Sequence, residues 1–566
     1  MIDIEKIPPR IRKPSTYLGN EINAFRKNLN NCNVTFALGY PDIYEVGMSN
    51  LGIRILYDIL NGLPDVGCDR FFAPGADMEE YLRSAGLPLF ALESKRPLRC
   101  FDFVGFSISS ELNYTNFLNL LDLARIPLRS QQRAEKDPFV VAGGNCAFQP
   151  EPLADFVDIW VVGEAEESIV ELVNVFRSMK GAPRAEMLFY FQQIPGVYVP
   201  SLYVAGKDGA VRPANGQIPG RIEKRVMKDF ESACFPVRWL VPQCDIVHDR
   251  ISLEIMRGCP QLCLFCQGGF CWKPVRKRSA EKVLELADKT YRNTGYEEIS
   301  LLSFSSGDHP EIEKIVDGLC RMFAGKNVAI SFPSLRIDSF SFELASRISA
   351  VRRTGLTFAP ETGETLRARI GKPITDEEVL VLALKARRAQ WRQLKLYFIL
   401  GLPGETHETV LEIAELVESI ARIISVRCSF NIFIPKPHTP FELDGFSSKQ
   451  EYQEKLRFLR DRFARNRFIR AEFRPYEIGL LECLLARGGR ELGPVIERVW
   501  KQGGRFENWN EFFSFERWDT ALETEKIDLK TYLGRFHKRE LPWKHISTGF
   551  PGEKLLAMRK NFDGVQ

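Results

Sequence analysis

Histidines and long apolar runs are scarce in this sequence, and their scarcity excludes particular classes of protein. The chain of 566 residues has six histidines, and the first of them is His248. A transmembrane helix needs about 18 or more consecutive apolar residues, and no such run occurs. The N-terminal sequence also lacks the apolar stretch of a secretory signal peptide. We therefore expect a cytoplasmic protein without a membrane span.

Neither sign of charge dominates the composition. Lys and Arg number 77 against 73 Asp and Glu, a net charge of +4, which excludes a dedicated nucleic-acid coat and an acidic solvating protein. The 13 cysteines are an odd number, and most stand singly in apolar surroundings. This usage is typical of a reduced cytosolic chain and not of a disulfide scaffold. The motifs of serine hydrolases, HExxH metalloproteases and phosphate-binding loops are also lacking.

Strands alternate with helices from Asn33 onward. Apolar segments at 33–39, 101–109, 139–144 and 158–167 predict buried strands, with helices near 46–61, 113–125 and 165–178 between and after them. This alternation predicts a parallel sheet of Rossmann-like type. Ligands of such sheets bind at the carboxyl ends of the strands. The glycines and serines predicted there include Ser49, Ser107, Gly143 and Gly144.

A second and more regular β/α series begins at Ile251. Its predicted strands lie near 251–256, 298–304, 328–332, 355–359, 394–400 and 426–434. Six such units fit a partial (β/α)₆ barrel, with a doubly wound sheet as the alternative. We thus expect an α/β protein with five segments: an N-terminal arm at 1–30, a Rossmann-like domain at 31–180, a connector at 181–248, a barrel at 249–445 and a mainly helical C-terminal domain and tail at 446–566.

One group of cysteines breaks the scatter, directly after the first strand of the second series. Cys259, Cys263 and Cys266 form a CxxxCxxC pattern. A structural zinc usually takes four protein ligands, whereas three thiolates suit a [4Fe–4S] cluster whose fourth iron is open. Cys271 follows five residues later and is the candidate fourth ligand. A structural four-cysteine zinc or cluster site therefore stays open as the alternative.

The cysteine pattern, with Phe265 before its last cysteine, resembles the signature of the radical S-adenosylmethionine (SAM) superfamily. The similarity continues in order at later strand ends, in SFSSGDHP (303–310), FAPETG (358–363), YFILGLPGET (397–406) and FIPKPHTPFE (433–442). The last of these resembles the elongator-type, methylthiotransferase and coproporphyrinogen-oxidase branches. At 303–308 only the position matches, because the usual Gly-Gly-Glu is missing. Each segment alone could also be a helix start, a rigid loop or a solvated cap.

This resemblance implies a reaction and a set of contacts. The three cysteines would bind a [4Fe–4S] cluster, which passes one electron to SAM and yields a 5′-deoxyadenosyl radical. A one-electron donor of flavodoxin or ferredoxin type would be needed. The implied SAM-binding residues are Phe265, Ser305, Ser306, Gly307, Asp308, Glu361, Gly401 and Pro403.

A Rossmann-like domain before such a barrel resembles the cobalamin-binding subgroup. Residues 143–172 resemble the closing part of those domains, and residues 30–550 as a whole resemble one uncharacterised family of this architecture. The resemblance implies a cobalamin that faces the loops of Ser49, Ser107 and Gly143–Gly144. A histidine of the first domain cannot bind its cobalt, since none precedes His248. Base-off binding without a histidine and a cofactor-free scaffold remain as the two alternatives.

The segment 455–474 is strongly basic, with eight Lys or Arg and only Asp461 and Glu472 against them. Its apolar residues recur at helical spacing, which predicts a helix. Arginines interleaved with aromatic residues can bind RNA, and a solvated helix outside the barrel is the alternative.

Taken together, the patterns predict a radical SAM enzyme that modifies or methylates an unidentified substrate, with RNA or a ribosome-related partner among the candidates. The alternative is a cluster-bearing redox-sensing or RNA-binding or partner-binding protein without SAM turnover.

Overall fold

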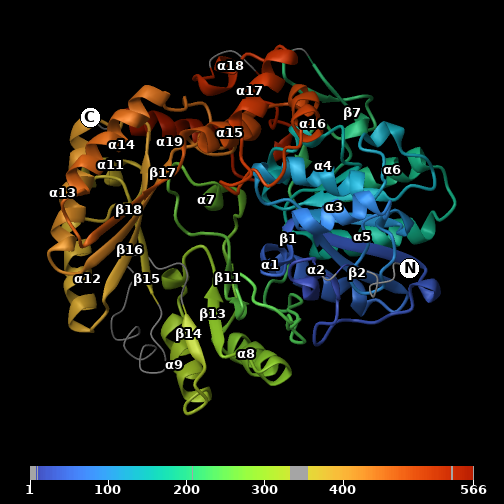
Figure 1. Ribbon diagram of the computed structural model, residues 1–566, viewed down its shortest axis with the longest axis horizontal. Helices are drawn as coiled ribbons and strands as arrows, with labels where there is room; N and C mark the ends of the chain where they lie inside the picture. Colours follow the sequence, from blue (N-terminus) through green and yellow to red (C-terminus); the bar gives the residue numbers. More distant parts are fainter. Residues whose placement is uncertain (1–7, 9, 207, 332–354, 537–539, 565–566) are drawn as a thin grey trace. The chain divides into compact units, whose positions relative to one another are not determined.

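The computed structural model describes residues 8, 10–206, 208–331, 355–536 and 540–564. The chain divides into two compact units (Figure 1). The first, here the N-terminal unit, comprises Met1–Asp249, Leu485–Leu529 and Lys538–Gly549. The second, here the barrel unit, comprises Arg250–Leu484, Lys530–His537 and Phe550–Gln566. His537 and Phe332, which ends one predicted strand, lie outside the described residues.

The N-terminal unit is built on a six-stranded sheet of order β2-β1-β3-β4-β5-β6. All neighbours are parallel except β6, which is antiparallel to β5. The four predicted strands are present, and β2 and β6 are additional. The fold class predicted from the sequence is therefore confirmed for this part of the chain. The strands are β1 Val34–Ile43, β2 Val66–Ala73, β3 Phe103–Ser107, β4 Phe139–Gly143, β5 Ile159–Val161 and β6 Val197–Tyr198.

Continuous apolar runs form the central strands because both of their faces are covered. Nine of the ten residues of β1 are buried. Phe36 stacks on Phe103 across β1 and β3, with ring centroids 5.2 Å apart, in a core that helices α2, α5 and α6 complete on one face. Phe117 of α4 packs on Phe106 of β3 at 4.8 Å. The helices are α1 Tyr44–Gly47, α2 Leu51–Gly62, α3 Ala76–Ser84, α4 Tyr114–Leu123, α5 Ala165–Ser178 and α6 Arg184–Gln192.

A C-terminal segment returns to complete the N-terminal unit. It contains α16 (Gly493–Lys501) and α17 (Phe515–Thr524). Arg490 forms a salt bridge with the buried Glu151 at 2.7 Å, and the Phe506 N–H donates to the Asn116 side chain at 2.7 Å. Short strand pairs lie beside the main sheet: β7 Tyr203–Ala205 with β8 Val211–Pro213, and β9 Ile222–Glu223 with β19 Ile546–Ser547.

Glu507 in this returning segment gives the stability of the protein a pH dependence. Its side chain is 1% exposed, and burial raises its pKa to about 7, against the lowering effects of Trp518, Arg517 and Arg505. In the unfolded chain the carboxyl ionises near its ordinary pKa of about 4.3, so its contribution to folding is lost as the pH rises from there through about 7.

We expect Glu507→Gln to raise the free energy of unfolding by about 2–4 kcal/mol at pH 8 and to change little at pH 4. Urea unfolding at both pH values measures this difference. Glu516→Gln, a carboxylate in the first turn of the neighbouring helix α17, serves as the control. An equal effect of Glu507→Gln at both pH values would contradict the assignment.

The barrel unit contains two parallel sheets, of order β10-β13-β14 and β15-β16-β17-β18. They include all six predicted strands. The strands are β10 Ile251–Glu254, β13 Glu298–Leu302, β14 Ala329–Ser331, β15 Leu356–Glu361, β16 Gln393–Leu400, β17 Ser425–Ile432 and β18 Ile469–Phe473, with a two-stranded antiparallel pair of β11 Met256–Arg257 and β12 Arg276–Lys277.

Alternating burial shows which face of the larger sheet meets the helices. In β17 every second residue is buried, and Phe430 stacks on Phe398 of β16 and Phe473 of β18 at 5.2 and 4.8 Å. Capping boxes start α12, α13 and α14. The helices of this unit are α7 Gln267–Cys271, α8 Ala280–Thr294, α9 Ile312–Met322, α11 Glu364–Arg369, α12 Asp376–Arg388, α13 His407–Ala421, α14 Lys449–Phe463, α15 Tyr476–Arg487 (which ends in the N-terminal unit), α18 Lys530–Leu533 and α19 Gly552–Gly564.

The predicted basic helix over 455–474 is wrong in its second half. Helix α14 ends at Phe463, and Ile469–Phe473 form β18, a seventh parallel strand. This strand pairs with β17 from Val426↔Ile469 to Phe430↔Phe473. The ladder hydrogen bonds and the Phe430–Phe473 stack favour the strand over continuation of the helix. None of the helices in the described part of the chain has the length and apolar character needed to span a bilayer.

Candidate functional site

The cysteine loop leaves the carboxyl end of β10 and is closed at its base by the β11–β12 pair. Met256 and Arg257 pair with Lys277 and Arg276. Gly258 has a φ of +83°, and a Cβ there would lie 2.5 Å from the Trp272 carbonyl oxygen. Only glycine fits this close backbone approach. The base of the loop is thereby fixed.

The three thiols are partly exposed on this loop, and they lie within electrostatic reach of one another. Burial raises the pKa of Cys259, and the nearby Cys263 raises it further. Burial also raises the pKa of Cys266, while the Gly268 and Gly269 N–H groups lower it and Cys259 raises it. These N–H groups are suited to stabilise a thiolate at Cys266. Cys271 is fully buried at the end of α7.

The donor set of the cysteine loop consists of the thiols of Cys259, Cys263 and Cys266. Across residues 10–331 and 355–564, apart from the few others not described, no group of three or more His, Cys, Asp or Glu is arranged to hold one metal ion. A [4Fe–4S] cube takes each thiolate at a different iron, so its ligands stand further apart than those of a zinc ion. Three cysteines leave one iron without a protein ligand.

Hydrophobic contacts fix the loop from below. Leu264 and Phe265, between the second and third cysteines, belong to a cluster with Leu366, Ile370 and Leu402. The Leu264 N–H donates to the Ile370 carbonyl at 3.0 Å. Phe265, predicted to contact SAM, is therefore at least in part an anchor of the loop.

The loop after β13 is bonded to the cysteine loop. The Asp308 carboxylate accepts from Gln261 Nε2 at 2.9 Å and from Ser305 Oγ at 2.7 Å. Ser306 is buried, and its Oγ donates to the Leu301 carbonyl at 3.0 Å. The structure thus brings the predicted Ser305, Ser306 and Asp308 beside the cysteine loop, with their side chains already bonded to protein.

Glu361 ends β15 at an irregularity in the strand pairing. The register with β16 shifts between Phe358 and Glu361, and Glu361 has a φ of +73°. Its carboxylate accepts from Lys372 Nζ at 2.8 Å, and its charge acts on Cys266. Glu361 is thus held in an ion pair with Lys372, within electrostatic reach of Cys266.

Gly401 and Pro403 follow β16. Gly401 has a φ of +86°, and a Cβ there would lie 3.0 Å from Ser447 Cβ. Its N–H donates to Glu405 Oε1 at 2.8 Å. Burial raises the pKa of Glu405, and the salt bridge with Lys455 opposes this rise. The tight turn after β16 is therefore fixed by a hydrogen bond to the buried Glu405, whose charge Lys455 neutralises.

Three residues of the site were not singled out from the sequence. Gln261 bonds to Asp308, Lys372 pairs with Glu361, and Gln267 Nε2 donates to the Pro437 carbonyl at 3.0 Å. The position of Gln261 inside the CxxxCxxC motif was the only feature of the sequence that pointed to a role in the site. Their partners lie 47, 11 and 170 positions away, so only the fold reveals the contacts.

The N-terminal unit brings together some of the residues predicted to face cobalamin. Ser107 pairs with Gly143 at the carboxyl ends of β3 and β4. Gly144 has a φ of +96°, and a Cβ there would lie 2.7 Å from the Ile108 carbonyl oxygen. The contact between these two loops accounts for the glycine without a cofactor. Ser49 lies elsewhere, where its Oγ accepts from the His248 N–H at 2.9 Å.

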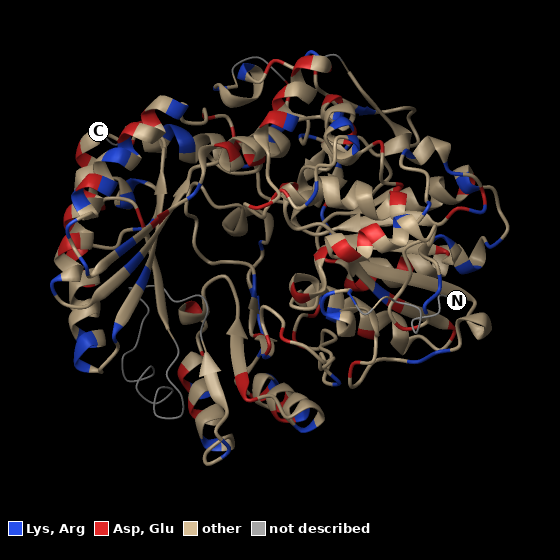
Figure 2. Ribbon diagram, in the orientation of Figure 1, with Lys and Arg blue, Asp and Glu red and all other residues tan. Residues whose placement is uncertain are grey.

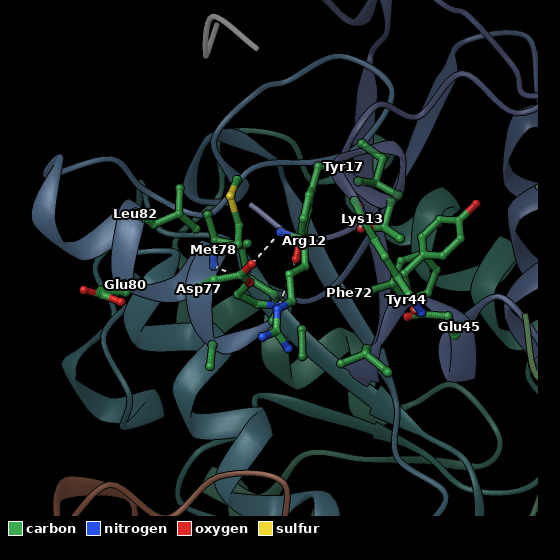
Figure 3. Close-up of a pocket in the computed structure, with 18 of the residues that line it drawn as sticks. Arg12, Lys13, Tyr17, Tyr44, Glu45, Phe72, Asp77, Met78, Glu80 and Leu82 are labelled. Carbon is green, nitrogen blue, oxygen red and sulfur yellow. Dashed lines mark hydrogen bonds and ion pairs between the residues drawn. The ribbon is translucent and has the colours of Figure 1, made fainter. Parts of the chain in front are cut away.

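A cavity of about 600 Å³ lies in the N-terminal unit at the carboxyl ends of β1 and β2 (Figure 3). Aromatic and apolar side chains line most of it, including Tyr17, Tyr44 and Phe72. The Arg12 N–H donates to Asp77 Oδ2 across one wall at 2.6 Å. Ser49, Ser107, Gly143 and Gly144 do not line this cavity.

Two segments of the chain match models of known protein families. Residues 52–200 match the family described as "Radical SAM proteins, N-terminal", and residues 253–417 match the "Radical SAM superfamily". An uncharacterised protein of Methanocaldococcus jannaschii is 26% identical over 513 residues, which are 90% of this chain and 98% of the relative. The tRNA-2-methylthio-N(6)-dimethylallyladenosine synthase of Shewanella baltica is 26% identical over 55% of this chain and 66% of its own length.

A solved structure shares the fold at low identity. The radical SAM methyltransferase TsrM of Kitasatospora setae, with cobalamin and a [4Fe–4S] cluster bound, has a TM-score of 0.50. It is 15% identical, over 72% of this chain and 74% of TsrM. Both matched families are radical SAM families, and the chain is an enzyme that belongs to the radical SAM superfamily.

Proposed function

We propose that Cys259, Cys263 and Cys266 bind a [4Fe–4S] cluster with which the enzyme cleaves SAM reductively. One observation carries this proposal above the others. The three thiols are partly exposed on a loop that hydrophobic anchors and three neighbouring loops fix in place. Such a preorganised donor set favours cluster binding because few side chains must reorder.

The residues around the thiols suggest distinct tasks. When bound, the cluster supplies one electron for cleavage of SAM into methionine and a 5′-deoxyadenosyl radical. Asp308, oriented by Gln261 and Ser305, presents a carboxylate that suits the SAM amino group. Glu361, oriented by Lys372, presents a second acceptor. The backbone at Gly401 and Pro403 gives a turn without bulky side chains beside this region, and the apolar cluster around Leu264 excludes water from below.

Anaerobic reconstitution with iron and sulfide, followed by dithionite and SAM, tests the proposal. We expect methionine and 5′-deoxyadenosine in equal amounts, measured by liquid chromatography and mass spectrometry. Cluster without either product would favour a redox-sensing or partner-binding protein and contradict SAM cleavage. Omission of dithionite gives the matched blank.

We propose further that the enzyme modifies or methylates its substrate. The likeness to a methyltransferase and to a tRNA-methylthiolating enzyme supports this class. Cobalamin in the N-terminal unit is supported by the shared fold and by the parallel strand order. Equilibrium dialysis against hydroxocobalamin tests cobalamin binding directly. If the protein retains no corrin, the N-terminal unit is a cofactor-free scaffold and the reaction is hydrogen abstraction without methyl transfer.

A further inference from the structure

The amino ends of β16, β17 and β18 carry an unusual concentration of positive charge. The segments 388–395, 422–427 and 465–472 bring eight cations to this end of the sheet and contain one carboxylate, Glu472. We name these eight cations the basic edge, and blue bands on the ribbon of the strands mark Lys and Arg in Figure 2. The basic edge consists of Arg388, Arg392, Lys395, Arg422, Arg427, Arg465, Arg467 and Arg470.

Three of these cations lie side by side on neighbouring strands. Lys395 pairs in register with Arg427, and Arg427 pairs with Arg470. Residues in register point to the same face of a sheet. Helix α14 covers the other face, because its Phe463 stacks on Phe430, which in turn stacks on Phe473. The row therefore lies on the face of the sheet opposite to this helix.

Like charges in register cost stability, and this row is only partly neutralised. Glu472 pairs with Arg427 at 2.7 Å and reaches Arg470 at 3.5 Å. Lys395 Nζ lies over the ring of Tyr397 at 4.8 Å. Among the described residues one carboxylate pairs with this row of three cations, so the row is net positive and pairing that stabilises the fold does not explain it.

The helix dipoles explain other cations of the edge but not the row. Helices α12, α13 and α14 end at this edge, and a cation at a helix C-terminus is stabilised there. That accounts for Arg388, Arg422 and Arg465, which are exposed. Lys395, Arg427 and Arg470 stand within strands, beyond the reach of this effect.

The basic edge is also separate from the cysteine loop. That loop leaves the carboxyl end of β10, whereas the edge lies at the amino ends of parallel strands. Eight-residue strands such as β16 span roughly 25 Å. A compact acidic electron donor seated there would stand far from the cluster, whereas a bound single-stranded RNA continues beyond the edge and can bring a distant nucleotide to it.

We propose that the basic edge binds the phosphate backbone of single-stranded RNA. The substrate class of the enzyme would then be RNA. Phosphates repeat along such a chain and match several cations at once. Phe468, 46% exposed beside the row, carries the Arg467 guanidinium over its ring at 5.0 Å and offers a platform on which a base can stack. The assignment as substrate rests on the proposed function, but RNA binding itself does not.

Fluorescence anisotropy of a labelled oligouridine on the reconstituted chain tests the proposal. Without dithionite no SAM is cleaved, so failure of the proposed reaction leaves this measurement intact. For the triple variant K395A/R427A/R470A we expect at least tenfold weaker binding and a salt dependence shallower by about 2 in log–log slope, since each phosphate contact contributes about 0.7. The matched control is K282A/K289A/R292A, which removes three cations of helix α8.

Two further measurements keep the test decisive. Glu472→Gln removes the only carboxylate of the edge and is expected to tighten RNA binding at least twofold. Circular dichroism should show that the triple variant melts no lower than the parent, because it loses like-charge repulsion. Unchanged RNA affinity and salt slope in the triple variant would overturn the proposal. If the triple variant fails to fold, the absence of tighter RNA binding by Glu472→Gln would overturn it. Equal competition by polyglutamate would identify an acidic protein as the partner instead of RNA.

Discussion

Cys263→Ala is expected to abolish both the iron–sulfur cluster and the formation of 5′-deoxyadenosine. Its thiol is the middle one of the three proposed ligands, on a loop whose neighbouring residues are fixed by hydrophobic contacts. Without this thiol the proposed cube would keep only two protein ligands. We expect iron and acid-labile sulfide after anaerobic reconstitution to fall to background, and SAM cleavage to fall by at least about a thousandfold.

Two other cysteines of the barrel unit serve as controls. Cys271→Ala tests the remaining candidate ligand, which is fully buried, and should retain the iron content of the parent. Cys320→Ser, on helix α9, controls for the loss of any thiol. If Cys271→Ala lost iron as completely as Cys263→Ala, the site would be a four-cysteine centre with no open iron, and the proposed SAM chemistry would fail with it.

The cysteine loop could be located from the sequence because its information is local. Three cysteines, a glycine and a proline stand within nine residues, directly after an apolar predicted strand. The orientation of the acceptors was not predictable. Asp308 and Glu361 are set by Gln261 and Lys372, and such pairs form only when separate loops meet.

The misassigned segment 469–473 shows a different limit. The arginines and apolar residues between 465 and 474 continue the helical spacing of α14, so periodicity alone favours a helix. The strand forms because β17 offers an open edge with which five residues pair. This tertiary gain lies outside the segment itself. The consequence is functional, since the strand places Arg470 in register with Arg427 and Lys395.

Strand β2 was missed for a related reason. Asp69 and Arg70 interrupt the apolar run VGCDRFFA, and charged residues argue against a strand buried on both faces. All eight residues are nevertheless buried. Arg70 is accommodated because Glu21 Oε2 accepts from its Nη2 at 2.7 Å and Glu93 Oε1 from its Nε at 2.6 Å. The ion pairs that complete the strand come from outside it.

Arg70→Ala should therefore destabilise the N-terminal unit by about 3–5 kcal/mol, since removing one partner of a buried ion pair leaves uncompensated charge. Glu21 and Glu93 would face each other without a cation. Burial already raises the pKa of Glu93 to about 7, while Arg70 lowers it. Loss of Arg70 would raise that pKa further, so the deficit should be smaller at pH 5 than at pH 8.

Urea unfolding followed by tryptophan fluorescence measures the effect of Arg70→Ala, because six of the eight tryptophans belong to the N-terminal unit. Arg83→Ala is the matched control: Arg83 also pairs with two carboxylates, Glu79 and Asp122, but its side chain is 42% exposed, and we expect a loss below about 1 kcal/mol. The variant R70M/E21Q/E93Q, which removes all three charges together, should recover most of the stability. Equal losses for Arg70→Ala and Arg83→Ala would show that burial of the ion pair does not decide the stability of β2.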